Sequence, residues 1–108
     1  MSADPLRGAV GPPFGVRLVR EGRAERVIVT GEVDLVTGPM LDEQVHGASA
    51  EHVVLDLTGV TFIDSVGVRV VCDAFELLGD RLAVVASDCC MFLFELAGLR
   101  DRLPLLER

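Results

Sequence analysis

The feature that most constrains the fold is an alternation of short apolar segments with segments of helical periodicity. Residues 27–30, 53–57 and 82–85 are mostly apolar and rich in valine, which is typical of buried strands. Each is followed by roughly ten residues in which apolar side chains recur every three or four positions, as on one face of a helix. Strands that alternate with such helices predict a parallel sheet joined by right-handed crossovers.

An opening hairpin is expected to make this sheet mixed. Residues 14–19 alternate apolar and polar side chains, as a half-buried strand does, and residues 20–23 supply a polar turn before the next strand. Residues 103–106 are a candidate short edge strand at the end of the sheet. The sequence therefore predicts an α/β fold, with a mixed, mostly parallel β-sheet and helices packed on it.

The chain is expected to form a single small domain. Its 108 residues leave no room for a second one. Residues 1–13 contain three prolines and two glycines and are predicted to be a flexible N-terminal tail, so the domain is assigned to residues 14–108.

The first expected helix follows a glycine- and acid-containing connection. Asp34 or Thr37 is expected to be its N-cap, because a side-chain oxygen there satisfies free backbone N–H groups. Its predicted apolar face consists of Val36, Met40, Leu41, Val45 and Ala48.

The second expected helix begins at Asp64 or Ser65. Arg69 and Asp73 are expected one turn apart on its outer face. Its predicted buried face consists of Val68, Val71, Cys72, Phe75 and Leu78.

The third expected helix, from Ser87 or Asp88 to about Ala97, is unusually apolar. If Cys90, Leu93, Phe94 and Ala97 face the sheet, Cys89, Met91 and Phe92 point outward. Either the C-terminal segment covers them, or Met91 and Phe92 belong to a surface for self-association or for a partner.

Charge and composition exclude several classes of function. The net charge of −7 argues against nucleic-acid binding, which requires clustered cations, and is compatible with a protein partner. No signal peptide or long apolar segment is present, so we expect no membrane association. The three cysteines have no metal-site or disulfide-framework spacing, which indicates reduced thiols in a cytoplasmic protein without a metal or cofactor.

The Asp64-Ser65 pair lies between two apolar segments and has three possible roles. Ser65 can cap the helix, accept a phosphate that the helix terminus tolerates, or act as a nucleophile. Only His46 and His52 could serve as a base, and the serine lies in no GxSxG motif, so we expect no enzyme. Gly67 costs a helix about 1 kcal/mol, which indicates close approach of another backbone or of a partner.

The stretch VVLDLTGVTFIDSVGVRVV at residues 53–71 closely resembles the signature of the STAS domain family. GEVDLVTGPML at residues 31–41 resembles the segment G-E-[LV]-D-x-x-T-x-x-x-L of that family, and FELAGLRDRLPL at residues 94–105 resembles its closing helix end. Val66 stands where a small or polar residue is common in relatives. In this fold Asp56 is expected to be structural and to pair with backbone N–H groups of the loop after its strand.

A STAS domain of this length resembles the bacterial anti-sigma factor antagonists. The resemblance implies that the unphosphorylated protein binds an anti-sigma factor that is also a serine kinase, which releases the sigma factor. It also implies that phosphorylation of Ser65 switches binding off and that a phosphatase restores it. The expected partner-binding residues are Asp34, Thr37, Asp64, Ser65, Val66, Gly67 and Arg69. The alternative is an interaction subunit of a larger regulatory complex that is never phosphorylated.

Overall fold

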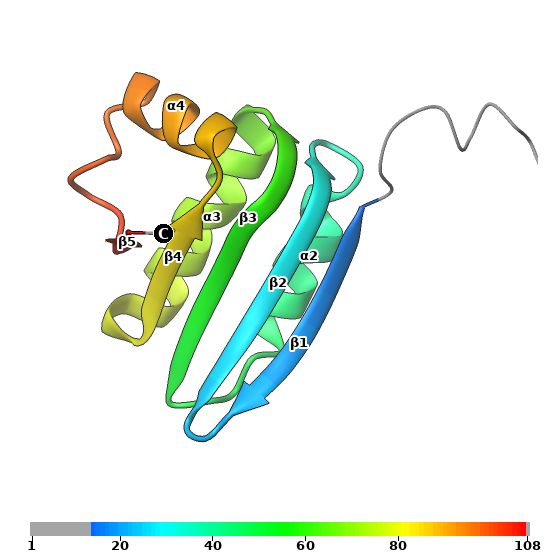
Figure 1. The fold of residues 1–108 in the computed structure, drawn as a ribbon, viewed down its shortest axis with the longest axis vertical. Coiled ribbons are helices and arrows are strands. Elements are labelled where there is room, and N and C mark those ends of the chain that lie inside the picture. Colours follow the sequence, from blue (N-terminus) through cyan, green and yellow to red (C-terminus); the bar gives the residue numbers. More distant parts are fainter. Residues whose placement is uncertain (1–13, 108) are drawn as a thin grey trace, which may run out of the picture.

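The computed structural model describes residues 14–107, which form one five-stranded sheet with helices packed on it (Figure 1). The elements in chain order are β1 (Gly15–Glu21), β2 (Ala24–Val33), α2 (Gly38–His46), β3 (His52–Ile63), α3 (Ser65–Leu78), the 3₁₀ turn η1 (Gly79–Arg81), β4 (Leu82–Ala86), α4 (Asp88–Leu96) and β5 (Leu105–Leu106). The predicted fold class is confirmed. The predicted tail at residues 1–13 lies outside the described residues.

The strands lie in the order β1-β2-β3-β4-β5. β1 pairs antiparallel with β2 through a turn at Gly22, whose φ of 64° suits a glycine, and this confirms the predicted hairpin. β2, β3, β4 and β5 pair in parallel. The carboxyl ends of β2, β3 and β4 therefore meet at one edge of the sheet, the upper edge in Figure 1. We call this the carboxyl edge.

β2 and β3 are longer than the sequence predicts. β3 continues through Thr58 and Gly59, where a strand end was expected, to Ile63. The pairing of β2 with β3 shifts register between Ile28 and Thr30, and a Cβ on Gly59 would lie 2.8 Å from Cγ2 of Thr30. The glycine therefore allows an irregular but continuous strand pair instead of a loop.

The core lies between one face of the sheet and the helices α2 and α3, which run behind the strands in Figure 1. Alternate strand residues point into it, as the two-residue period of a strand requires. The largest fully buried side chains are Phe94, Leu41, Leu55, Leu57, Val27, Val29, Val33, Val45, Val53, Val71 and Val84, together with Cys90. Apart from Phe94 and Cys90 they are aliphatic, as expected for a chain without tryptophan or tyrosine.

The predicted faces of α2 and α3 are partly right. α2 buries Leu41 and Val45 as expected, but Val36 and Met40 are exposed, because the helix begins only at Gly38 and Val36 lies in the preceding loop. α3 buries Val68, Val71 and Leu78 as expected, whereas Cys72 and Phe75 are only half-buried. Val70 and Ala74, which were not predicted, are buried as well. Val70 is buried because it lies against Gly38 of α2.

The face of α4 differs from the prediction at three positions. Cys90 and Phe94 are buried and Phe92 is exposed, as expected. Cys89 and Met91 are half-buried against the core instead of pointing outward, and the Cys89 thiol donates a hydrogen bond to the Val60 carbonyl oxygen at 3.3 Å. Ala97 is exposed, because the helix ends at Leu96.

Candidate functional site

The junction between β3 and α3 contains one residue, Asp64, which is the N-cap of α3. Its backbone is extended, and its Oδ1 accepts hydrogen bonds from the backbone N–H of Val66 at 2.9 Å and of Gly67 at 3.2 Å. Two of the free N–H groups of the helix are therefore satisfied by this carboxylate. Of the two residues at which the helix was expected to begin, Asp64 is the N-cap and Ser65 is the first helical residue.

Ser65 is the first residue of α3 and is exposed. Its hydroxyl has no hydrogen-bond partner within residues 14–107, because Asp64 already provides the cap. The serine is therefore held by a rigid helix start while its hydroxyl faces solvent. A phosphate at this position would lie at the positive end of the helix dipole.

Gly67 lets the start of α3 pack directly against the ends of β2 and β3. A Cβ there would lie 2.6 Å from Cγ1 of Ile63 and 2.9 Å from the carbonyl oxygen of Val33. The close approach that the sequence indicated is therefore to the chain's own strands. Gly67 was among the predicted partner-binding residues, but it is buried and therefore not in a position to touch a partner. Val66 is half-buried and lies close to Gly38 of α2, so only part of its side chain is open to a partner.

Asp34 and Thr37 lie beside this junction, in the loop between β2 and α2. Oδ1 of Asp34 accepts hydrogen bonds from the backbone N–H of Val36 at 2.9 Å and of Thr37 at 3.0 Å. The Thr37 hydroxyl accepts one from the backbone N–H of Asp34 at 2.9 Å. Thr37 occupies the N-cap position, but its side chain makes no capping bond to the helix. The hydrogen bond from the Thr37 backbone N–H, with that from Val36, outweighs the opposing effect of desolvation and lowers the pKa of Asp34.

The consequence of this bonded loop is that Leu35 and Val36 point into solvent, with 72% and 74% of their surface exposed. No sequence pattern pointed to Leu35, and helical periodicity predicted Val36 to lie on the apolar face of the helix. In the sequence, Leu35 and Val36 lie between Asp34 and Thr37, whose side chains each accept a hydrogen bond from the other's backbone N–H. Asp and Thr three residues apart are typical of such a turn, and this pattern could have predicted the exposure of the two residues between them.

An apolar groove of about 240 Å³ lies next to Ser65, between α3 and α4. Its walls are Ser65, Val68, Leu93, Leu96 and Ala97. Leu96 and Phe92 of α4 are 68% and 64% exposed, and Phe62 near the end of β3 is also exposed. The carboxyl edge therefore combines a free serine hydroxyl with several exposed apolar side chains, which is the composition of a protein-binding surface rather than of a catalytic pocket.

Arg69 is the positively charged residue one helical turn after Ser65. It is exposed, and its expected ion pair with Asp73 is not among the ion pairs of residues 14–107. The guanidinium is therefore available to a partner or to a phosphate on Ser65.

Asp56 is structural, as expected. Its Oδ1 accepts hydrogen bonds from the Thr58 backbone N–H at 3.0 Å and from the Thr58 hydroxyl at 2.7 Å, and its Oδ2 pairs with Arg26 at 2.7 Å. Burial raises the pKa of Asp56, but the bonds to Thr58 and Arg26 outweigh it and leave the pKa lowered.

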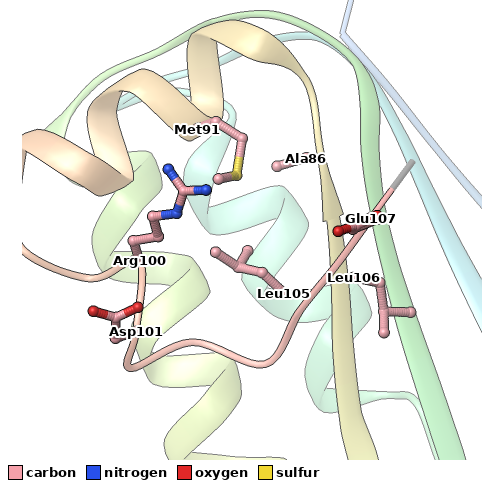
Figure 2. A pocket seen from close by; sticks show the side chains of 7 residues that line it. All are labelled: Ala86, Met91, Arg100, Asp101, Leu105, Leu106 and Glu107. Atoms are coloured by element: carbon pink, nitrogen blue, oxygen red, sulfur yellow. The ribbon is translucent and has the colours of Figure 1, made fainter.

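A larger hollow, of about 460 Å³, lies between α4 and β5 (Figure 2). Met91, Leu105 and Ala86 provide apolar walls, and Arg100, which is ion-paired with Glu95, lies at its rim. Its lining contains no serine, cysteine or histidine. Of the three free cysteines, Cys90 is buried, and burial raises its pKa to about 11, which leaves it a poor nucleophile.

In residues 14–107 no group of three or more His, Cys, Asp or Glu side chains is arranged to hold a metal ion. None of the helices between Phe14 and Glu107 has the length and apolar character needed to cross a membrane.

Comparison with known proteins gives the family. The family model described as STAS domain matches residues 20–89, which include the β3–α3 junction with Ser65. The chain belongs to the STAS domain family. The resemblance predicted from the sequence is therefore confirmed.

Two curated relatives of this STAS domain are the anti-sigma-B factor antagonists of Listeria monocytogenes and Listeria innocua. Each is 37% identical over 82 residues, which cover 69% of this chain and 72% of the relative.

Solved structures share the fold. An anti-sigma factor antagonist from Mycobacterium paratuberculosis superposes with a TM-score of 0.79 at 29% identity, covering 86% of this chain and 85% of the other. The anti-sigma factor antagonist SpoIIAA in its unphosphorylated form superposes with a TM-score of 0.67 at 16% identity, covering 87% and 88% of the two chains. At this lower identity the second comparison supports the fold alone.

Proposed function

We propose that this STAS domain is an anti-sigma factor antagonist in the cytoplasm. In its unphosphorylated form it binds an anti-sigma factor that is also a serine kinase, and the sigma factor is released. Phosphorylation of Ser65 by that kinase ends the binding, and a phosphatase restores it. The observation that carries the proposal is the exposed, unbonded hydroxyl of Ser65 at a helix start that Asp64 already caps. The names of the Listeria relatives support the same assignment.

The apolar side chains around Ser65 provide the binding energy in this proposal. A partner that covers the carboxyl edge removes Leu35, Val36 and Leu96 from water, and exposed apolar area of this kind stabilises a complex when buried. Asp34 and Thr37 contribute indirectly, because their hydrogen bonds hold Leu35 and Val36 outward. The groove between α3 and α4 accepts an apolar side chain of the partner next to the serine.

A phosphate on Ser65 weakens such a complex through charge and solvation. It adds about −1.5 to −2 charges at pH 7, next to the carboxylate of Asp64 and among apolar side chains. Burying this dianion under a partner is unfavourable, and a loss of about 3 kcal/mol lowers the affinity more than a hundredfold. Arg69 pairs with the phosphate within the same helix, which withdraws the guanidinium from the partner.

The alternative function is an interaction subunit of a larger regulatory complex whose Ser65 is never phosphorylated. The same apolar carboxyl edge serves this role. The two functions differ in what a negative charge at Ser65 does: it releases the partner in the first and changes little in the second.

Capture of partners from the native cell lysate distinguishes the two. Wild type, Ser65→Glu and Ser65→Ala are immobilised at equal density, and bound proteins are identified by mass spectrometry. The proposal predicts that a kinase-like anti-sigma factor is captured by wild type and Ser65→Ala and lost from Ser65→Glu. Equal capture by all three variants would favour the subunit in a larger complex.

A further inference from the structure

The outer edge of β1 is a long strand edge without a neighbour. β1 lies at the end of the strand order, and nothing in residues 14–107 pairs with its outer side. All seven of its residues pair with β2 in an unbroken register, and the strand contains no proline. Natural proteins usually protect such an edge with bulges, prolines, charged side chains or a covering element. Within residues 14–107, β1 has only the charged side chains Arg17, Arg20 and Glu21. The opposite edge of the sheet, β5, has only two residues and offers no comparable surface.

The charges along β1 are self-complementary. Its sequence is Gly15-Val-Arg-Leu-Val-Arg-Glu21. When two copies lie antiparallel about Val19, Arg17 of each copy is directly opposite Glu21 of the other, and the two Val19 side chains meet between these pairs. Because directly opposite residues point to the same face of a sheet, both ion pairs form on one face.

Arg17 and Glu21 differ in the ion pairs that they form within the described chain. Arg17 is exposed and forms no ion pair within residues 14–107, whereas Arg20, the other arginine of the strand, pairs with Glu25 at 3.8 Å. Glu21 is 57% exposed and only loosely paired with Arg26, at 3.6 Å. Arg17 is therefore the charge on this strand that lacks a partner.

We propose that a second copy of this chain binds at the outer edge of β1, giving a symmetric dimer with one continuous antiparallel sheet and reciprocal Arg17–Glu21 ion pairs. Backbone N–H and C=O groups of alternate β1 residues point away from β2 and supply the hydrogen bonds between the copies. On the other face of the sheet, Leu18 of one copy lies opposite Arg20 of the other, whose aliphatic stem covers it. β1 is separated from β3 and the α3 start by β2, so the dimer leaves Ser65 accessible.

Sedimentation velocity of the full chain over a wide range of concentration tests the dimer. Wild type is expected to form a dimer whose dissociation constant rises with salt. Arg17→Glu places like charges opposite each other twice and is expected to weaken the dimer about tenfold or more. Arg102→Glu makes the same change in net charge at an exposed position far from β1 and serves as the control.

The charge reversal Arg17→Glu/Glu21→Arg sharpens the test, because it restores both ion pairs in the opposite sense. The proposal predicts that Glu21→Arg alone weakens the dimer and that the double variant recovers most of the wild-type affinity. Circular dichroism of each variant establishes that the monomer is folded. A monomer at all concentrations, or a dimer that Arg17→Glu leaves intact, would overturn the proposal. So would a dimer lost in Phe92→Glu and retained in Arg17→Glu, which would assign self-association to α4.

Discussion

The two strand-to-helix junctions at the carboxyl edge begin alike and differ in what they build. β2 ends at Val33 and β3 ends at Ile63. Each of these buried branched residues is followed by an aspartate, Asp34 or Asp64. After Ile63 the helix starts at once, and the Asp64 carboxylate caps it. After Val33 four residues intervene, and the Asp34 carboxylate bonds inside the loop instead.

The difference shows how an aspartate can shape the carboxyl edge in two ways, depending on the length of the junction that follows it. The short junction fixes a polar residue, Ser65, in one position relative to the sheet. The longer junction exposes two apolar residues, Leu35 and Val36, beside it. The proposed function, in which phosphorylation of Ser65 releases a partner, requires both a rigidly held serine and a nearby apolar contact.

The largest expected effect on stability comes from Gly67 in the short junction. Gly67→Ala places a Cβ against Ile63 and the backbone of Val33 and is expected to destabilise the domain by about 2 to 3 kcal/mol despite the better helix propensity of alanine. Urea unfolding measures this. Gly38→Ala is the matched control, because its Cβ lies at 3.2 Å from Val66 and its expected cost is below about 1 kcal/mol. Equal costs for both variants would refute the internal role of Gly67.

The two junction aspartates are expected to differ when each is replaced by alanine. Asp64→Ala removes two hydrogen bonds to a helix start and should cost about 1 to 2 kcal/mol of stability. Asp34→Ala removes hydrogen bonds within a surface loop, which water replaces, and should cost less than Asp64→Ala. Thermal unfolding of the two variants gives the order. A larger loss for Asp34→Ala would show that the long junction carries more of the stability than its geometry indicates.

The pH dependence of stability should reveal the loop bonds of Asp34. Because the folded state lowers the pKa of Asp34, the ionised group stabilises the fold above its unfolded pKa of about 4, and this contribution is lost as the pH falls through the lowered value. The stability difference between wild type and Asp34→Asn should therefore shrink on acidification. Urea unfolding at a series of acidic pH values measures it, with exposed Asp101→Asn as the control. A difference that grows at low pH would contradict this.

The smallest effect on stability is expected at the exposed apolar residues of the long junction. Leu35→Ser and Val36→Ser should change the unfolding free energy by no more than about 0.5 kcal/mol, because both side chains are already in water. Binding to the anti-sigma factor partner should nevertheless weaken about tenfold or more. Leu77→Ser, at a half-exposed site on α3 away from the carboxyl edge, should leave binding unchanged. Isothermal titration calorimetry separates the two sites.

The sequence predicted the fold class and the position of Ser65 because both depend on patterns local to the chain. Alternating apolar segments indicate the strands, and the acid-serine pair resembles a family motif. The extension of β3 beyond Thr58 could not be predicted, because it depends on how Gly59 passes Thr30 of a neighbouring strand. The exposure of Leu35 and Val36 was missed because side chain–backbone bonds, not helical periodicity, decide that loop.

The central claim is that phosphorylation of Ser65 ends binding to the kinase partner. The most direct measurement mixes the captured anti-sigma factor with wild type or Ser65→Ala, adds ATP, and follows both the bound fraction and the site of phosphorylation by mass spectrometry. The account predicts phosphate on Ser65 and release of wild type, while Ser65→Ala remains bound. Phosphate on a different residue, or a wild-type complex that persists after Ser65 is fully phosphorylated, would contradict it.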